Sequence, residues 1–211
     1  MWPQHEQTEE LLAKTRLGDA AAVNQLLERH RDAVHRMVRL RLDAKVQRRV
    51  DVSDVVQDVM VEANRRLQDY LARPEQMAFH LWLRQIAKDR IIDAHRRHRG
   101  SAKRSVDREQ PHLVGGGDPQ STYDLVAQLR DPQRGPASAV ADQEMAKIVE
   151  AAISELADQD CEIVIMRHYE HLSNQEIAQA LELTEPAASM RYLRAIRKLR
   201  EVLGKGNEES S

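Results

Sequence analysis

A helical pattern that stops, turns and starts again between residues 173 and 203 constrains the fold of this chain more than any other feature. Ser173 and Glu176 have the S-x-x-E spacing of a capping box, in which each residue binds a backbone N–H group at the start of a helix. Thr184 then precedes Glu185 and Pro186 as an N-cap precedes a first helical turn. Because both starts are marked, the sequence predicts two helices joined by a tight turn.

The apolar residues of these two helices indicate how they pack. Ala188, Tyr192, Ala195 and Leu199 follow a four-three-four spacing, which is one seam of a helix, and they can pack against the apolar face that includes Ile177. This arrangement is a helix-turn-helix, whose second helix can enter the major groove of DNA. An ordinary helical hairpin with a solvated arginine face is the alternative. The residues predicted to reach DNA are Thr184, Glu185, Ala187, Ser189, Met190, Arg191, Arg194 and Arg197.

The composition and hydrophobic periodicity of the remainder of the chain favour helices. Aromatic residues make up only 3% of the 211 residues, so the cores must be built from Leu, Val, Ile, Met and Ala. Helical periodicity runs through residues 7–99 and returns at 139, whereas 100–138 is rich in Gly and Pro, with at most a turn of helix near 123–129. We predict an all-α fold of two small helical domains, 1–99 and 139–203, joined by a flexible linker at 100–138 and followed by a disordered tail at 204–211.

Charge is distributed in blocks that the net charge of -2 conceals. Residues 84–108 contain nine Lys or Arg against three acids, and residues 142–162 contain seven acids against one Lys. A polyanion-binding surface and an acidic surface can therefore coexist in one chain. The single cysteine excludes an intramolecular disulfide, and no apolar run is long enough for a signal peptide or a membrane span, which predicts a cytoplasmic protein without membrane insertion.

Two motif sets resemble those of bacterial RNA polymerase sigma factors of the extracytoplasmic function group. Residues 172–203 are similar to sigma region 4, whose pattern is L-S-x-x-E-I-A-x-x-L, a turn, and R-x-x-R-A-x-x-x-L. DVSDVVQDVMVEA, from residue 51, resembles the acidic helix of region 2, and WLRQIAKDRIIDAHRRHR, from residue 82, resembles its promoter-reading helix. Both sets occur in the expected order around a linker.

This resemblance implies a sigma factor, which directs core polymerase to promoters and starts transcription without enzymatic activity or a cofactor of its own. Region 2 would bind the polymerase clamp helices and capture the -10 element, and region 4 would bind the flap and read the -35 element. An anti-sigma factor is a further candidate partner. The implied polymerase-binding residues are Asp54, Gln57, Asp58 and Glu62. The implied -10 residues are Arg84, Lys88, Asp89, His95, Arg96 and Arg97.

The sequence departs from the family pattern at several positions and leaves alternatives open. Glu182 stands where the family has a glycine in the turn, Ser189 where Lys is frequent, and Asp89 where Asn or Arg is commoner. A free-standing helix-turn-helix regulator is the main alternative function, and a metal-dependent enzyme using Asp54, Asp58 and Glu62 ranks below it.

Two smaller alternatives concern single sites. Cys161, His168 and His171 resemble a metal-ligand set only weakly, because their spacing is mixed, so we predict no metal site. Trp82 could stack on nucleic acid, but its position between Leu81 and Leu83 favours a place in the core.

Overall fold

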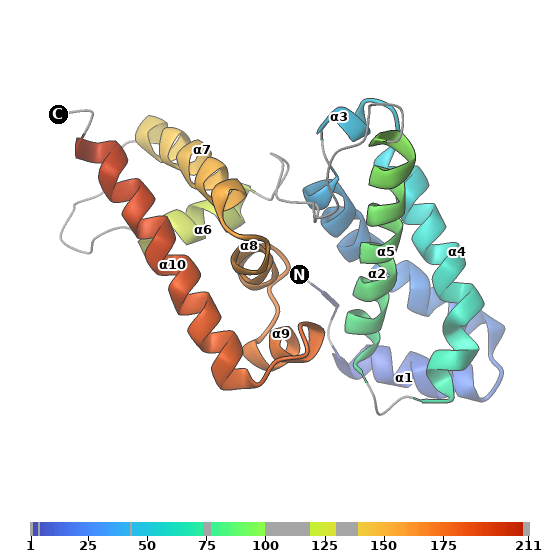
Figure 1. The fold of residues 1–211 in the computed structure, drawn as a ribbon. Coiled ribbons are helices and arrows are strands. Elements are labelled where there is room, and N and C mark those ends of the chain that lie inside the picture. The colour runs from blue at the N-terminus through green and yellow to red at the C-terminus, as the bar shows by residue number, and fades with distance from the viewer. Residues whose placement is uncertain are drawn as a thin grey trace. The chain divides into compact units, whose positions relative to one another are not determined.

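The protein folds into helices in every regular element that its structure describes, which confirms the predicted all-α class. The computed structural model describes residues 2–3, 5–42, 44–73, 77–99, 119–129 and 139–208. The chain divides into two compact units, Met1–Pro111 and His112–Ser211 (Figure 1).

The described residues of the first unit form five helices, two of which begin at capping residues that the structure shows. Gly18 takes a φ of 87° in the turn before the second helix, and Asp19 caps that helix by accepting from the N–H groups of Ala21 and Ala22. Asp51 caps the fourth helix through the N–H of Ser53, at 2.8 Å. The helices are α1 (His5–Arg16), α2 (Ala20–Arg41), α3 (Ala44–Gln47), α4 (Val52–Leu71) and α5 (Phe79–Arg99).

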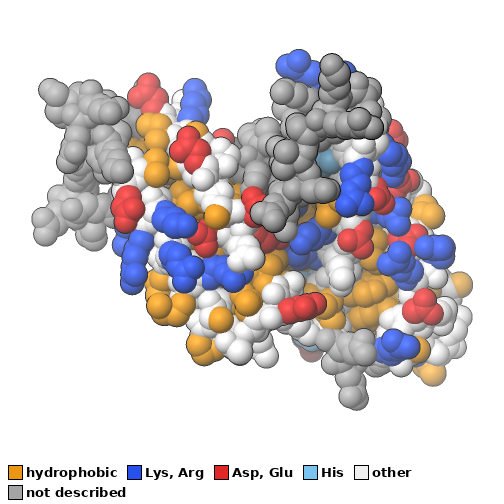
Figure 2. Space-filling view, in the orientation of Figure 1, with side chains coloured by type: hydrophobic (Ala, Val, Ile, Leu, Met, Phe, Trp, Pro, Cys, Tyr) orange, Lys and Arg blue, Asp and Glu red, His pale blue; other side chains and the backbone are white. Residues whose placement is uncertain are grey.

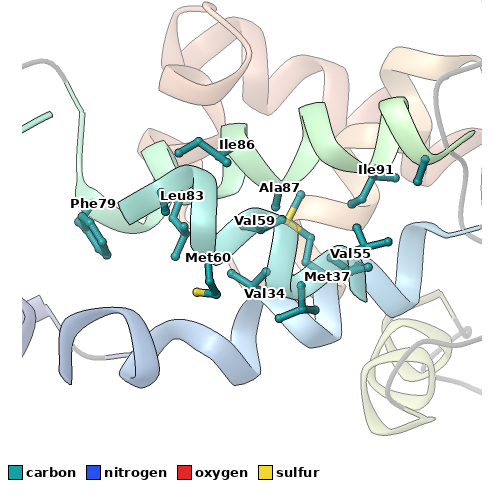
Figure 3. Packing of buried hydrophobic residues seen from close by; sticks show 14 of the residues in the cluster. Val34, Met37, Val55, Val59, Met60, Phe79, Leu83, Ile86, Ala87 and Ile91 are labelled. Carbon is teal, nitrogen blue, oxygen red and sulfur yellow. The ribbon is translucent and has the colours of Figure 1, made fainter. Parts of the chain in front are cut away.

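The core of the first unit lies between α2, α4 and α5. Side chains from these three helices point toward one another in Figure 3, with Val34 and Met37 from α2, Val59 from α4 and Ile91 from α5 all buried. They are aliphatic, as the low aromatic content predicts. One end of this core is different, because Trp82 packs there against Tyr70 and Phe79, with ring centroids 4.8 Å and 5.4 Å away. Trp82 is therefore a half-buried core residue.

The second unit contains the helix-turn-helix. Its elements are α6 (Pro119–Leu129), α7 (Ala139–Glu155), α8 (Asp158–Val164), the π-helical turn η2 (Ile165–Tyr169), α9 (Asn174–Ala180) and α10 (Glu185–Glu208). α8 continues directly into η2, and both belong to one buried apolar segment that runs through Ile163, Val164, Ile165 and Met166. α10 packs against α7, α8 and α9, so the second helix of the motif rests on most of the unit.

The segment 100–138, predicted as linker, contains more structure than its sequence texture indicates. Residues 119–129 form the helix α6, and its Leu125 and Val126 are buried. The Thr122 hydroxyl lies 3.1 Å from the Tyr169 hydroxyl and donates to Glu150 at 3.2 Å. The sequence did not predict the full length of this helix, because its apolar face is only three turns long and Gly and Pro residues flank it. The triple glycine at 115–117 lies outside the described residues.

The C-terminal helix is also longer than predicted. α10 continues to Glu208 through two glycines, whereas the sequence predicts a disordered tail from residue 204. Each glycine disfavours the helix by about 1 kcal/mol. Extending an existing helix avoids the cost of a new nucleus, which is why glycines near a helix end do not stop it by themselves. Only residues 209–211 of the predicted tail lie outside the described part of the chain.

Both predicted helix starts in the interrupted segment are present. Glu176 accepts from the Ser173 N–H at 2.7 Å while Ser173 Oγ accepts from the Glu176 N–H at 3.2 Å, which completes the capping box. Thr184 Oγ1 accepts from the Ala187 N–H at 3.3 Å. These caps satisfy backbone donors that a helix start otherwise leaves without partners.

The turn between α9 and α10 has a left-handed backbone of the kind that glycine favours, although it contains no glycine. Glu182 has a φ of 54°, in the left-handed region. The Leu183 N–H donates to Ala178 O at 2.8 Å and the Glu182 N–H to Gln179 O at 3.3 Å, which are the two hydrogen bonds of a Schellman motif. Glu182 therefore occupies the position that suits a glycine, at a cost in backbone strain.

Candidate nucleic-acid interface

The packing side of α10 matches the seam predicted from its spacing. Ala188, Ala195 and Leu199 are fully buried, and Tyr192 is half-buried beside them. On the opposite side Ala187, Met190, Arg194 and Arg197 are exposed. Thr184 and Glu185 are exposed at the start of the helix, whereas Ser189 and Arg191 are half-buried at the edges of the seam. The structure therefore places most of the predicted DNA-reading residues on open surface.

Tyr192 anchors α10 through polar contacts that the sequence did not reveal. Its hydroxyl lies 2.9 Å from His168 Nε2 and 3.0 Å from Gln128 Nε2, and the Arg167 guanidinium lies 5.7 Å from the ring centroid. Burial raises the pKa of Tyr192 and lowers that of His168 to about 4, so both are neutral near pH 7. The contacts of Tyr192 tie α10 to η2 and to α6.

The basic side chains of α10 divide into two groups. Lys198 donates to the buried Asp160 at 2.5 Å, and Arg200 donates to the backbone of Gln128 at 3.2 Å, so both help to hold the helix in place. Arg194 and Arg197 are exposed on the outer face. Lys and Arg side chains gather over the middle of α10 in Figure 2. A surface of this charge suits the phosphate backbone of a nucleic acid.

The acidic face predicted on α4 is present for three of its four residues. Asp54, Gln57 and Asp58 are exposed and share one side of the helix, together with Val61, which is 58% exposed. Glu62 is different, because it is buried. Residues four apart are offset by about 40° around an α-helix, so the row that begins at Asp54 turns toward the core as it reaches Glu62.

Glu62 is the centre of an ion cluster rather than part of a docking surface. Arg65 donates to it at 2.6 Å and 3.0 Å, Arg66 contacts it, and Arg90 approaches from α5 to 3.6 Å. The hydrogen bond from Arg65 is the largest of the effects that hold the pKa of Glu62 below its usual value. Glu62 therefore joins α4 to α5 and does not belong to the exposed face of Asp54, Gln57 and Asp58, and its contact with polymerase stays a prediction.

The residues predicted to contact the -10 element also divide by burial. Asp89, Arg96 and Arg97 are exposed and Lys88 is half-buried, whereas Arg84 and His95 are 3% and 8% exposed. His95 Nε2 lies 3.2 Å from the backbone oxygen of Arg41 on α2. Arg84 and His95 share the helical stripe of the buried residues of α5, which places them inside. In this structure they are not on the exposed side of α5, and their contact with the -10 element stays a prediction.

The weak metal-ligand set is used in other ways. Cys161 is buried, His168 contacts Tyr192, and His171 Nε2 lies 3.5 Å from Ser121 Oγ. Within the described ranges no three His, Cys, Asp or Glu side chains come together as a metal site would require.

The acidic block at 142–162 is partly internal. Asp160 and Glu162 are buried, and Asp160 accepts from Lys198. Glu144 and Glu155 are exposed on α7. Fewer of its acidic side chains therefore reach the surface than the sequence suggests.

Two protein-family models match the chain, one in each unit. Sigma-70 region 2 matches residues 26–101, and sigma-70 region 4 matches residues 146–199. Together they cover more than half of the 211 residues. The chain belongs to the sigma-70 family. The matches confirm the sequence-based interpretation of an RNA polymerase sigma factor that binds core polymerase and promoter DNA. A free-standing regulator is not favoured, because it would leave region 2 unexplained.

A solved protein structure has the same fold. CnrH, determined in complex with the cytosolic domain of CnrY, is similar to this sigma factor with a TM-score of 0.56 and 24% sequence identity, over 92% of this chain and 96% of that chain. This likeness shows the fold alone. The extracytoplasmic function group stays a prediction from the sequence. A search of curated protein sequences found no match.

No helix in the described part of the chain is both long and apolar enough to cross a bilayer.

Proposed function

We propose that the two units of this sigma factor divide promoter recognition between exposed faces of three helices. The outer face of α10 reads the -35 element. The side of α5 with Lys88, Asp89, Arg96 and Arg97 contacts the -10 element, and Asp54, Gln57 and Asp58 on α4 bind the polymerase clamp. The observation that carries the proposal is the separation on α10 between a fully buried seam and an exposed face with two arginines.

The charge of the α10 face gives a direct test on DNA binding. If Arg194 contacts a phosphate, Arg194→Ala releases one fewer counterion, so the slope of log K against log salt becomes shallower by about one unit. The measurement is binding of reconstituted holoenzyme to a promoter selected from a random DNA library, over a series of salt concentrations. Arg16→Ala, which removes an exposed arginine from the last turn of α1, is the matched control. Equal slopes for the wild type and Arg194→Ala would refute the assigned role of Arg194.

The acidic face of α4 gives a separate test on polymerase binding. Asp58→Asn removes one exposed charge without touching the Glu62 cluster, and it should weaken binding to core polymerase in the absence of DNA. Asp32→Asn on α2 removes an exposed carboxylate elsewhere on the unit and should leave binding unchanged. Competition against a labelled wild-type chain for core polymerase measures both. Equal competition by both variants would count against this face.

Regulation by a protein partner is part of the proposal. CnrH was solved together with the cytosolic domain of CnrY, which shows that a protein of this fold forms such a complex. We propose that this chain also binds an anti-sigma factor, acts in the cytoplasm and has no enzymatic activity of its own. Affinity purification of the tagged chain from its own cells, with and without added core polymerase, tests the partner. Recovery of polymerase subunits alone would argue against an anti-sigma factor.

A further inference from the structure

The outer face of α10 is apolar where a recognition helix approaches the base pairs. Ala187 and Met190 lie in its first two turns, and Arg194 follows one turn later. At about 100° per residue these three side chains fall within about 60° of one another, opposite the buried seam. Met190 is 56% exposed, and Pro186 beside it is exposed as well. The first arginine on this face therefore comes only after two turns of apolar surface.

The hydrogen-bonding side chains near this face are directed elsewhere. Thr184 Oγ1 accepts from the Ala187 N–H as the helix cap. Ser189 is half-buried and lines a pocket of about 250 Å³ with Ile163 and Ile177, about 100° around the helix from Met190. Arg191 is also half-buried, at the edge of the seam. Polar readout of bases by the centre of the face is therefore weak.

The major-groove edges of the base pairs carry one apolar group, the C5 methyl of thymine. Ala and other apolar side chains contact this methyl in protein–DNA complexes. We infer that Ala187 and Met190 read the pattern of thymine methyl groups in the -35 element, while Arg194 and Arg197 bind the adjacent phosphates. The inference rests on the proposed function, and it adds the chemical feature of the DNA that α10 distinguishes.

Replacing thymine with uracil tests this inference, because uracil keeps the base pair and lacks the methyl. The promoter is the one selected by the holoenzyme from a random library, and each thymine of its -35 element is replaced in turn. The transfer free energy of one buried methyl group corresponds to about fourfold in affinity. We expect binding of wild-type holoenzyme to fall by about this factor at one position or more.

Two variants distinguish methyl contact from altered DNA shape. Met190→Ala should bind the thymine promoter more weakly and should lose most of the uracil effect at the position that Met190 contacts. Val202→Ala, which shortens another exposed apolar side chain far along α10, should keep the full effect. Wild-type binding that is indifferent to uracil at every position would overturn the inference, as would an equal loss in wild type and Met190→Ala. Failure to select any promoter would instead refute the proposed function.

Discussion

Replacing Glu182 with glycine should stabilise the second unit, because it relieves the left-handed backbone of the α9–α10 turn. Glu182 has a φ of 54° and is exposed. A left-handed residue with a β-carbon destabilises the fold by about 1–2 kcal/mol, which glycine avoids. Glycine itself lowers the free energy of unfolding by about 0.4–1 kcal/mol, because it makes the unfolded chain more flexible. The net gain is about 0.5–1 kcal/mol. For a unit of about 100 residues this raises the melting temperature by roughly 2–8 °C.

The distribution of tryptophan allows the two units to be followed separately in the intact chain. Both tryptophans, Trp2 and Trp82, lie in the first unit, so their fluorescence reports unfolding there, whereas circular dichroism at 222 nm reports helix loss in both units. Glu182→Gly should shift part of the dichroism transition upward and leave the fluorescence transition unchanged. The shift should be the same in buffers of different ionic strength, because it arises from the backbone.

Glu182→Ala is the matched control, because it removes the same carboxylate and keeps the β-carbon. It should leave the melting temperature near that of the wild type. If Ala and Gly raise the melting temperature equally, the gain comes from removing charge and not from the backbone, and the reasoning is refuted. A lower melting temperature for Glu182→Gly would refute it as well.

Three further predictions concern buried polar groups. Burial lowers the pKa of His30 from 6.5 to about 3. Between pH 7 and pH 5 His30 therefore becomes protonated in the unfolded chain but stays neutral in the folded one. Acidification over this range should destabilise the first unit by up to about 2 kcal/mol. Urea unfolding followed by tryptophan fluorescence measures this, and His30→Gln should weaken the pH dependence. Glu62→Gln should lower the melting temperature of the first unit, whereas Asp58→Asn should not. Tyr192→Phe removes the hydroxyl that contacts His168 and Gln128, and it should lower the free energy of unfolding of the second unit by about 1–2 kcal/mol. Urea unfolding followed by circular dichroism measures this loss. Tyr123→Phe is the control and should have little effect.

Local signals in the sequence were sufficient to predict the helix-turn-helix. The capping box at Ser173, the cap at Thr184 and the seam through Ala188, Ala195 and Leu199 depend on residues within one or two turns of each other, and all are present. The presence of Glu182 instead of glycine did not change the left-handed backbone of the turn. Tertiary packing of α9 and α10 keeps Glu182 in a conformation that its side chain disfavours.

Burial of charged residues could not be read from type and spacing alone. Glu62, Arg84 and His95 looked like surface groups because charged side chains usually are. Glu62 and His95 lie on sides of their helices that face a neighbouring helix, where Arg90 contacts Glu62 and the backbone oxygen of Arg41 contacts His95. Those partners lie far away in the sequence. The contacts of Tyr192 with Gln128, 64 residues apart, were hidden for the same reason.

Folding of α6 into the second unit shortens the stretch of chain between the last helix of one unit and the first helix of the other. The covalent connection between α5 and α6 is residues 100–118, about half of the segment 100–138. Its greatest possible span is therefore about 70 Å, from about 3.5 Å per residue. For flexible connections of equal stiffness that are longer than the distance to be spanned, effective concentration varies as about the -3/2 power of length, so halving the length corresponds to about a threefold increase. The position of α6 thus sets an upper limit on how far apart the two units can bind.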